Sequence, residues 1–384
     1  MSFYDGYIFF ACLIPILIIA VIIGVLEKPL RFYSLFASLL FIFLVFGKEP
    51  IQLIYLLAFY LLELGIVKGY LFLRTKYGRK EKTYYFLVFL AILPLILCKI
   101  SPFLSVNIFG FLGISYLTFR AVQMVIEIYD GVITEVPIVE FTGFLLFFPS
   151  LSSGPIDRSR RFHEDWLTTY NRKDYLNLVG DGLFKICLGL VYKIVLAALF
   201  YKAMSHLEDG TTIPWLIGYA YTYGFYLFFD FAGYSLMAIG TAYILGVKTP
   251  DNFNKPFISI DIKDFWNRWH ITLSHWFRDF IFSRFIIKCV KKKWFNSRLQ
   301  RASAGFIVNM FIMGAWHGLD FSYLLYGLYH GVLLALTEIY QKKSKFYKKN
   351  KDKKIYKIVS WFITLQLVMF GFLIFSGRFL AVLK

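Results

Sequence analysis

The stretch GYIFFACLIPILIIAVIIGVL, from Gly6 to Leu26, contains 21 residues and no charged side chain. A helix of roughly 20 apolar residues is long enough to cross the hydrocarbon core of a bilayer. Asp5 rather than a basic cluster precedes the stretch, and no cleavage site of the A-x-A type follows it. We therefore expect a retained first transmembrane helix instead of a secretory signal peptide.

The composition of the whole chain agrees with a membrane location. Of 384 residues, 58% are hydrophobic, 21% are aromatic and only 17% are charged. Soluble domains have roughly 45–50% apolar residues even when glycine is counted. A soluble globule of this length could not enclose so much apolar surface, and exposing it would cause aggregation. The composition therefore excludes disordered and collagen-like classes and predicts an all-α polytopic membrane protein.

Uncharged runs recur along the chain and predict further crossings. The clearest are Phe32–Gly47, Ile100–Phe119, Thr211–Phe229, Phe231–Val247, Ala302–Leu319, Phe321–Thr337 and Val359–Gly377, with less pure candidates near 50–73, 83–99 and 177–201. We expect about 10–12 transmembrane helices, together with re-entrant or interfacial helices.

The basic residues predict the orientation of the chain. Forty-two Lys and Arg against 24 Asp and Glu give a net charge of +18. They lie between apolar spans, which is typical of topology signals and contacts with anionic lipids rather than of nucleic-acid binding. If 211–247 counts as one long or broken crossing, placing the N-terminus outside puts the basic loops in the cytoplasm. These loops contain Lys28 and Arg31, 74–82, 158–161, 248–301 and 342–354.

Three stretches are neither clean spans nor ordinary loops. Phe141–Phe148 is apolar but too short to cross, Asp230 interrupts a long apolar run, and 257–290 is both aromatic and basic. Polar backbone or charge at membrane depth is tolerated when it is buried in protein or faces a water-filled cavity. These stretches therefore predict an internal passage. For Asp230 we expect a partner, either backbone donors at Gly233-Tyr-Ser or a lysine such as Lys193.

The densest polar and aromatic segment is DFWNRWHITLSHWFRD, residues 264–279. If it forms one helix, an apolar side carries Trp266, Trp269, Leu273, Trp276, Phe277 and Phe280, and the other side carries Lys263, Asn267, Ser274 and Arg278. His270 lies at the border of the two sides. The segment fits an interfacial amphipathic helix, and it also fits a helix in which His270 has a chemical role.

A second histidine stands in the segment MGAWHGLD, residues 313–320. Gly314 and Gly318 flank His317 and permit close approach of backbone or substrate. A neutral histidine is a natural general base for a hydroxyl, although His317 could instead bond to a neighbouring helix carbonyl. His330 is interpreted as a packing histidine, and the remaining histidines as surface or interfacial.

Motifs for other chemistry are missing from the sequence. It has no HxxxH or HExxH pattern, no Walker motif and no GxSxG elbow, so we predict no metal and no tightly bound cofactor. The four cysteines lack CxxC spacing. An enzyme of this kind would have to receive an activated donor from elsewhere.

Six motifs together resemble the membrane-bound O-acyltransferase family. They are GISYLTF at 113–119, FPSLSSGP at 148–155, DFAGYS at 230–235, NFNKP at 252–256, DFWNRWHITLS at 264–274 and WHG at 316–318. The resemblance implies a ring of transmembrane helices around a thin central region with a tunnel. It also implies a single membrane domain over 1–384, with N-terminal helices at 1–105, a core with the histidines at 106–340, and a basic loop and last helix at 341–384.

By this resemblance, the essential histidine of the family falls on His317 and its second polar position on His270. Counting spans places His317 near the outer end of its helix rather than in mid-tunnel. Further residues expected to line the tunnel or contact substrate are Trp266, Asn267, Trp269, Ser274, Trp316 and Asp230.

The resemblance is strongest to the branch of the family that transfers D-alanine in Gram-positive bacteria. It implies a D-alanine donor, held as a thioester on the phosphopantetheine of a small acidic cytosolic carrier protein. The acceptor would be a hydroxyl in the D-alanylation of teichoic acid, and the partners would include other membrane proteins of that pathway and membrane lipids. The alternatives are a polysaccharide O-acetyltransferase of the same superfamily and a proton-coupled transporter or flippase that uses Asp230, His270 and His317 as a relay. Inverted repeats would favour a transporter, and we see none.

One cytoplasmic segment is a candidate docking site for the carrier. Phe285, Ile286 and Ile287 form an apolar group between Arg284 and Lys288. An acidic partner with a short apolar patch would match this group. The alternative is an interfacial helix that inserts these residues into lipid.

Overall fold

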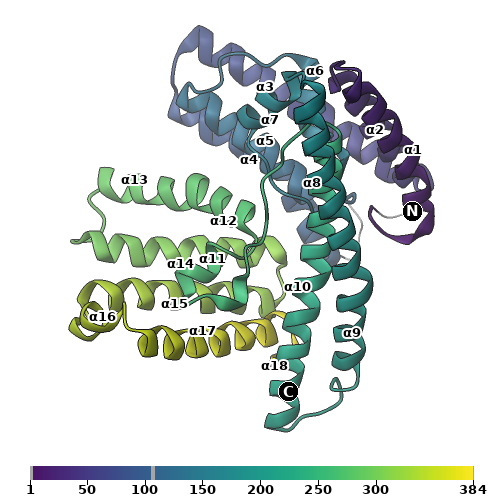
Figure 1. The fold of residues 1–384 in the computed structure, drawn as a ribbon. Coiled ribbons are helices and arrows are strands. Elements are labelled where there is room, and N and C mark those ends of the chain that lie inside the picture. Colours follow the sequence, from purple (N-terminus) through teal and green to yellow (C-terminus); the bar gives the residue numbers. More distant parts are fainter. Residues whose placement is uncertain (1–2, 105–108, 384) are drawn as a thin grey trace. The chain divides into compact units, whose positions relative to one another are not determined.

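The computed structural model describes residues 3–104 and 109–383, which contain helices and no strand (Figure 1). The chain forms two compact units. The first comprises Met1–Leu190 and Gly233–Pro250, and the second comprises Val191–Ala232 and Asp251–Lys384. The division falls within the long helix α10 (Ile213–Ile244). The single membrane domain expected over 1–384 remains a prediction.

Six helical segments in the described residues are long and apolar enough to cross a membrane. They are α1 (Gly6–Val25), α3 (Pro50–Tyr77), α4 (Glu81–Ile100) with the 3₁₀ helix η1 (Ser101–Leu104), the continuous α8 (Arg172–Leu190), η3 (Val191–Leu196) and α9 (Ala197–Ser205), α10, and α17 (Lys354–Phe375). Large apolar side chains on these helices, such as Ile18, Phe86 and Phe184, are exposed. Exposed apolar surface of this extent suits contact with lipid rather than water, which confirms the polytopic all-α class.

Most predicted spans coincide with helices, and one does not. The run Phe32–Gly47 falls on α2 (Arg31–Phe46), and the two runs at 302–319 and 321–337 fall on α14 (Arg298–His317) and α15 (Phe321–Lys343). The predicted span Ile100–Phe119 is wrong, because α4 ends at Ile100 and α5 (Ile114–Asp130) begins only after Gly113. Gly113 has a left-handed φ of 93°, a conformation that stops a helix from continuing through it.

In the first unit, buried aromatic rings join α1 and α2 to the short helices that follow α5. Phe41 stacks on Phe148 with ring centroids 4.4 Å apart, and Phe9 lies 5.1 Å from Phe41. Phe148 opens the 3₁₀ helix η2 (Phe148–Ser150), which follows α6 (Ile138–Leu145) and precedes α7 (Ser159–Leu167). The apolar stretch 141–148, too short to cross, is therefore a packed core segment of this unit.

A buried arginine organises that segment. Arg120 on α5 donates to the carbonyl oxygens of Phe144 (2.9 Å), Leu145 (3.0 Å) and Ser150 (2.5 Å). Carbonyls at the ends of short helices lack partners within the helix, and burying them unpaired would be costly. Arg120 therefore permits the chain to break and turn inside an apolar environment.

In the second unit, α14, α15 and α17 lie side by side (Figure 1). Gly314 and Gly327 face each other where α14 packs on α15, because a Cβ atom on either would lie 3.0 Å from the other's Cα. The close backbone approach predicted for Gly314 is thus confirmed. The Tyr329 hydroxyl donates to the Leu367 carbonyl at 2.9 Å and links α15 to α17.

Short elements complete the second unit. They are η4 (Pro256–Ile258), α11 (Ile262–Trp266), α12 (Ile271–Phe277), the π-helix η5 (Arg278–Phe282), α13 (Ser283–Lys291), α16 (Lys345–Asn350) and α18 (Arg378–Val382).

Candidate active site

The segment 264–279 is not the single helix that its periodicity predicts. α11 ends at Trp266 and α12 begins at Ile271, and between them His270 has a left-handed φ of 43°. The cause is Asn252, whose carbonyl oxygen accepts from the Ile271 amide at 2.9 Å. The Asn252 side-chain oxygen accepts from the Thr272 hydroxyl at 2.5 Å. Both bonds hold the start of α12 at a turn that the Asn252 segment defines.

Five of the six residues of the predicted apolar side are nevertheless buried, whereas Phe280, in the π-helix η5, is half-buried. Trp266, Trp269, Leu273, Trp276 and Phe277 all have buried side chains. The aromatic rings nearest to Trp269 are Phe372 at 4.9 Å and Phe253 at 5.2 Å. Burial of the tryptophans therefore fixes the positions of α11 and α12 in spite of the break.

His270 is enclosed by the second unit. It is 3% exposed, and its ring meets the edge of Phe231 with centroids 4.6 Å apart. Its Nε2 atom is buried and has no hydrogen-bond partner among the described residues. A left-handed non-glycine residue costs about 1–3 kcal/mol and is typical of functional sites. The strained turn and the unpaired nitrogen make His270 a candidate for binding a substrate group.

The charge state of His270 follows from its surroundings. His270 lies outside the six candidate spans. Burial, and to a lesser degree the neighbouring His317, lowers the pKa of His270 well below its usual value. Burial disfavours the charged form because water no longer solvates it. The imidazole is therefore neutral at physiological pH and can donate one N–H.

His317 is the last residue of α14. Its ring contacts those of Trp316 at 4.5 Å and Phe375 at 5.0 Å, and it is half-buried. His317 belongs to the same unit as His270 and is the smaller of the two causes that lower the pKa of His270. The structure thus brings together the two histidines that the sequence singled out, in one unit.

His330 connects the two histidine segments, a role that the sequence did not indicate. Its Nδ1 atom accepts from the Trp266 indole N–H at 3.3 Å. Its ring lies 4.6 Å from that of Tyr326, which in turn lies 6.4 Å from His317. His330 is a packing histidine, as expected, and it also orients Trp266. In the sequence, only the neighbouring Gly327 and Gly331 could have indicated that other helices approach His330 closely.

The other predicted substrate residues lie in different environments. The Ser274 hydroxyl donates to the Trp269 carbonyl at 3.2 Å, and Trp316 is half-buried next to His317. Asn267 is exposed, while its neighbour Trp266 is buried. Trp266, Trp269, Ser274 and Trp316 therefore belong to the histidine region, and the structure places the Asn267 side chain at the surface of the unit.

Asp230 has the lysine partner that the sequence proposed. Lys193 Nζ lies 2.5 Å from Asp230 Oδ1. Lys193 stands on the π-helix η3, and both residues belong to the second unit. An ion pair permits two charges to remain within apolar spans, so pairing rather than backbone donors accounts for Asp230.

The predicted carrier-docking group on α13 divides into two faces. A Cβ atom at Gly305 of α14 would meet the Phe282 ring and Ile286 Cδ1, so Ile286 packs inward. Ile287 is 64% exposed, and Lys288 is exposed beside it. Arg284 and Phe285 are half-buried. Only part of this group is therefore available to a partner.

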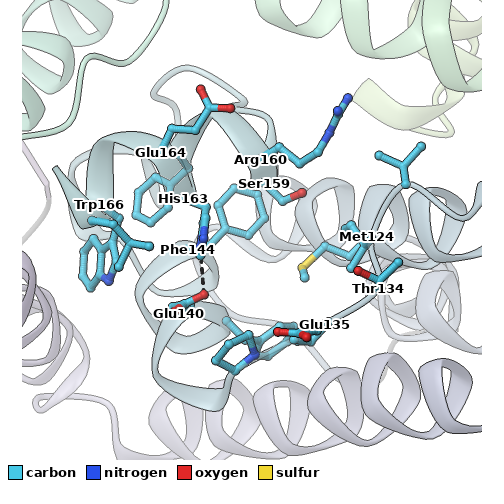
Figure 2. A pocket seen from close by; sticks show the side chains of 17 residues that line it. Met124, Thr134, Glu135, Glu140, Phe144, Ser159, Arg160, His163, Glu164 and Trp166 are labelled. Atoms are coloured by element: carbon cyan, nitrogen blue, oxygen red, sulfur yellow. Dashed lines mark ion pairs between the residues drawn. The ribbon is translucent and has the colours of Figure 1, made fainter.

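The first unit contains a separate hollow of about 530 Å³. Figure 2 shows His163 of α7 and Glu140 of α6 pointing toward one another across part of it, with His163 Nδ1 2.8 Å from Glu140 Oε2. Its lining also includes Phe144, Trp166 and Arg160. The sequence predicted His163 to be a surface or interfacial residue, and its side chain is 45% exposed.

The chain is similar to known proteins along nearly its whole length. Residues 51–377 match the membrane-bound O-acyltransferase family. The chain is 40% identical to a teichoic acid D-alanyltransferase of Bacillus subtilis (strain 168), over 98% of each chain. It is also 40% identical to the Streptococcus thermophilus protein of that name, over 97% of this chain and 94% of the relative. A probable alginate O-acetylase AlgI of Pseudomonas aeruginosa is 31% identical over 73% of this chain and 52% of the relative.

Proposed function

Because this chain belongs to the membrane-bound O-acyltransferase family, we propose that it is the acyltransferase that attaches D-alanine to teichoic acid in a Gram-positive cell membrane. The observation that carries this proposal is the near full-length similarity to two teichoic acid D-alanyltransferases. The alginate O-acetylases match a smaller part of the chain at lower identity, so polysaccharide O-acetylation is less well supported.

The donor in this proposal is D-alanine carried as a thioester on a phosphopantetheine arm. A thioester is already activated, so the transfer needs neither a metal nor a nucleotide. The acidic carrier protein would deliver it to the cytoplasmic side, where the basic loops are expected. Other membrane proteins of D-alanylation would act with the acceptor.

The transfer uses His317 as general base. The acceptor hydroxyl gives its proton to a ring nitrogen of His317 while its oxygen bonds to the thioester carbonyl carbon. The carbon–sulfur bond then breaks, and the departing phosphopantetheine thiolate takes the proton from His317. The products are a D-alanyl ester and a free thiol, and His317 is neutral again. General-base assistance of this kind contributes typically about 10²–10⁴-fold to the rate.

His270 would stabilise the negative charge that forms on the carbonyl oxygen. Its neutral imidazole has one N–H to donate, and its Nε2 is unpaired in a buried site. Donors fixed in advance around a developing oxyanion stabilise the transition state more than the substrate. Asn252 and the buried tryptophans support this role, since they hold His270 in place without substrate.

The exposed edge of α13 would receive the carrier. Ile287 offers apolar surface and Lys288 offers positive charge to an acidic partner. Apolar contact at the centre of an interface contributes most of the affinity, whereas rim charges mainly speed association.

Reconstitution tests the proposal. The purified protein is placed in vesicles with carrier protein bearing labelled D-alanine, with teichoic acid as acceptor. We expect loss of label from the thioester and its appearance in alkali-labile ester. Transfer from carrier loaded with labelled acetate, without transfer from carrier loaded with labelled D-alanine, would favour O-acetylation instead. Retention of label on the carrier in the presence of every acceptor would contradict acyl transfer.

A further inference from the structure

A second hollow, of about 1120 Å³, lies in the second unit, and no histidine lines it among the described residues. Its walls are the end of α15, the short helix α16, the start of α17 and residues Ile260–Ile262. The sequence places this region at the cytoplasmic end of the span α17, because the basic loop at 342–354 precedes it. Neither the motifs nor the proposed reaction accounts for this hollow.

Its rim is positively charged. Lys351, Lys353, Lys354 and Lys357 line it and are exposed. None of these ammonium groups has a hydrogen bond or ion pair with another described residue. The rim carboxylate of Asp261 is already engaged, since it accepts from Gln341 Nε2 and from the Asp264 amide, each at 2.9 Å. With Asp352 as the other acidic lining residue, the hollow presents unpaired cations to an occupant.

An apolar stripe leads from this rim along α17. Ile355, Val359 and Ile363 recur once per turn, line the hollow, and are 78%, 51% and 52% exposed. Residues four apart lie on one face of a helix. Because α17 is a candidate span, the stripe continues from the lysines toward the hydrocarbon core.

Tyrosine rings lie beside the lysines of the rim. Tyr340 and Tyr347 lie 5.6 Å apart, Tyr347 and Tyr356 lie 6.1 Å apart, and all three line the hollow. Tyrosine is enriched at the level of lipid head groups. The hollow therefore presents positive charge, then tyrosine rings, then apolar surface. A phospholipid presents the matching parts in the same order, namely the phosphate, the head-group region and the acyl chains.

We propose that this hollow binds one anionic phospholipid of the cytoplasmic leaflet. The lysines contact the head-group phosphate, and an acyl chain lies along the Ile355, Val359 and Ile363 stripe. An acidic protein would satisfy the lysines but could not follow the stripe into the bilayer. The cytoplasmic leaflet supplies anionic lipids to basic juxtamembrane groups.

The same hollow touches the start of α11. Asp261 and Ile262 line it, and the Ser360 hydroxyl of α17 donates to the Ile260 carbonyl at 2.6 Å. Lys263 of α11 pairs with Glu338 of α15. A bound lipid would therefore lie against the segment that precedes Trp266 and His270. Binding itself does not depend on acyl transfer.

The test measures lipid retention directly. Full-length protein is purified from nanodiscs of phosphatidylcholine with phosphatidylglycerol, and bound phosphatidylglycerol is counted by native mass spectrometry. The triple variant Lys353→Gln, Lys354→Gln, Lys357→Gln should retain phosphatidylglycerol at least about tenfold more weakly, because each juxtamembrane lysine contributes to anionic-lipid affinity. The matched control, Lys76→Gln, Lys80→Gln, Lys82→Gln, removes the same charge from another basic loop and should bind as the parent does.

A second variant tests the acyl-chain stripe. Val359 is exposed, so Val359→Trp fills the stripe without disturbing a core, and it should also weaken retention of phosphatidylglycerol. Unchanged retention in the lysine triple variant would overturn the proposal. Equal displacement by glycerol phosphate, together with full retention in Val359→Trp, would show an anion site without a lipid and would overturn it as well. Displacement of the lipid by the acidic carrier alone would assign the surface to a protein partner.

Discussion

Replacing Asn252 with alanine removes the side-chain oxygen that holds the turn before α12, and it should lower the rate of acyl transfer about 10- to 100-fold. Two donors of the buried Thr272 lose their acceptor, the hydroxyl at 2.5 Å and the amide at 3.4 Å. Removing the acceptor of a buried donor costs up to about 1–3 kcal/mol. The backbone bond from Ile271 to the Asn252 carbonyl remains in the variant, so the protein should still fold.

The lost energy is comparable with the cost of the turn itself. A left-handed residue such as His270 costs about 1–3 kcal/mol, so removing the Asn252 side chain should let the turn relax into other conformations. The rate then falls with the fraction of molecules that keep His270 in place. Because α13 is unchanged, the KM for charged carrier should stay within about twofold while kcat falls.

Labelled D-alanyl transfer from carrier to teichoic acid is the assay for this prediction. Asn254→Ala is the matched control, since its side chain is exposed and its backbone bonds to Arg268 are retained. Adding Thr272→Val to Asn252→Ala removes the hydroxyl whose acceptor was deleted and should recover part of the lost rate. A rate for Asn252→Ala above about a third of the parent rate, or an equally slow Asn254→Ala, would contradict a role of the Asn252 side chain in holding His270.

Three further substitutions test the remaining parts of the account. His270→Ala should abolish transfer almost completely, whereas His275→Ala on the same segment should have a mild effect. A larger loss of transfer in His275→Ala than in His270→Ala would show that the wrong histidine has been chosen. Asp230→Asn should keep substantial activity, because an amide can still accept a hydrogen bond from Lys193, and complete loss with normal folding would favour a proton relay. Ile287→Asp should abolish binding of charged carrier to the detergent-solubilised protein, where anchoring in a bilayer no longer matters. Val132→Asp, an exposed apolar position in the first unit, should bind carrier normally, and normal binding by Ile287→Asp would place the docking site elsewhere.

Hydropathy predicted most helices because burial in lipid is a local property of each run of residues. The run Thr211–Val247, in which Asp230 is the single charge, is one helix from Ile213 to Ile244, and Lys193 is the partner of that charge. The run Ile100–Phe119 failed because uncharged residues do not reveal where a helix breaks. The α-helix ends there at Ile100, and α5 begins only after Gly113, whose backbone is left-handed.

The histidine region was only partly predictable for a different reason. Periodicity identified the buried tryptophan side, but the turn at His270 depends on Asn252, which lies outside the segment that periodicity evaluates. The π-helix at Arg278–Phe282 then changes the phase of the helix, since it adds residues per turn. Sequence alone therefore could not tell that Ile286 packs on α14 while Ile287 faces outward. His330 likewise gains its role from Trp266, a contact between distant helices.

Single-turnover transfer by His317→Ala tests the central claim most directly. Carrier protein loaded with labelled D-alanine is mixed with an excess of the variant in vesicles that contain acceptor, and the label left on the thioester is followed with time. His206→Ala serves as a folding and purification control. We predict less than about a tenth of the parent rate for His317→Ala, with unchanged carrier binding, because a general base typically contributes about 10²–10⁴-fold. Transfer by His317→Ala at more than about a tenth of the parent rate would contradict the assignment of His317 as the general base.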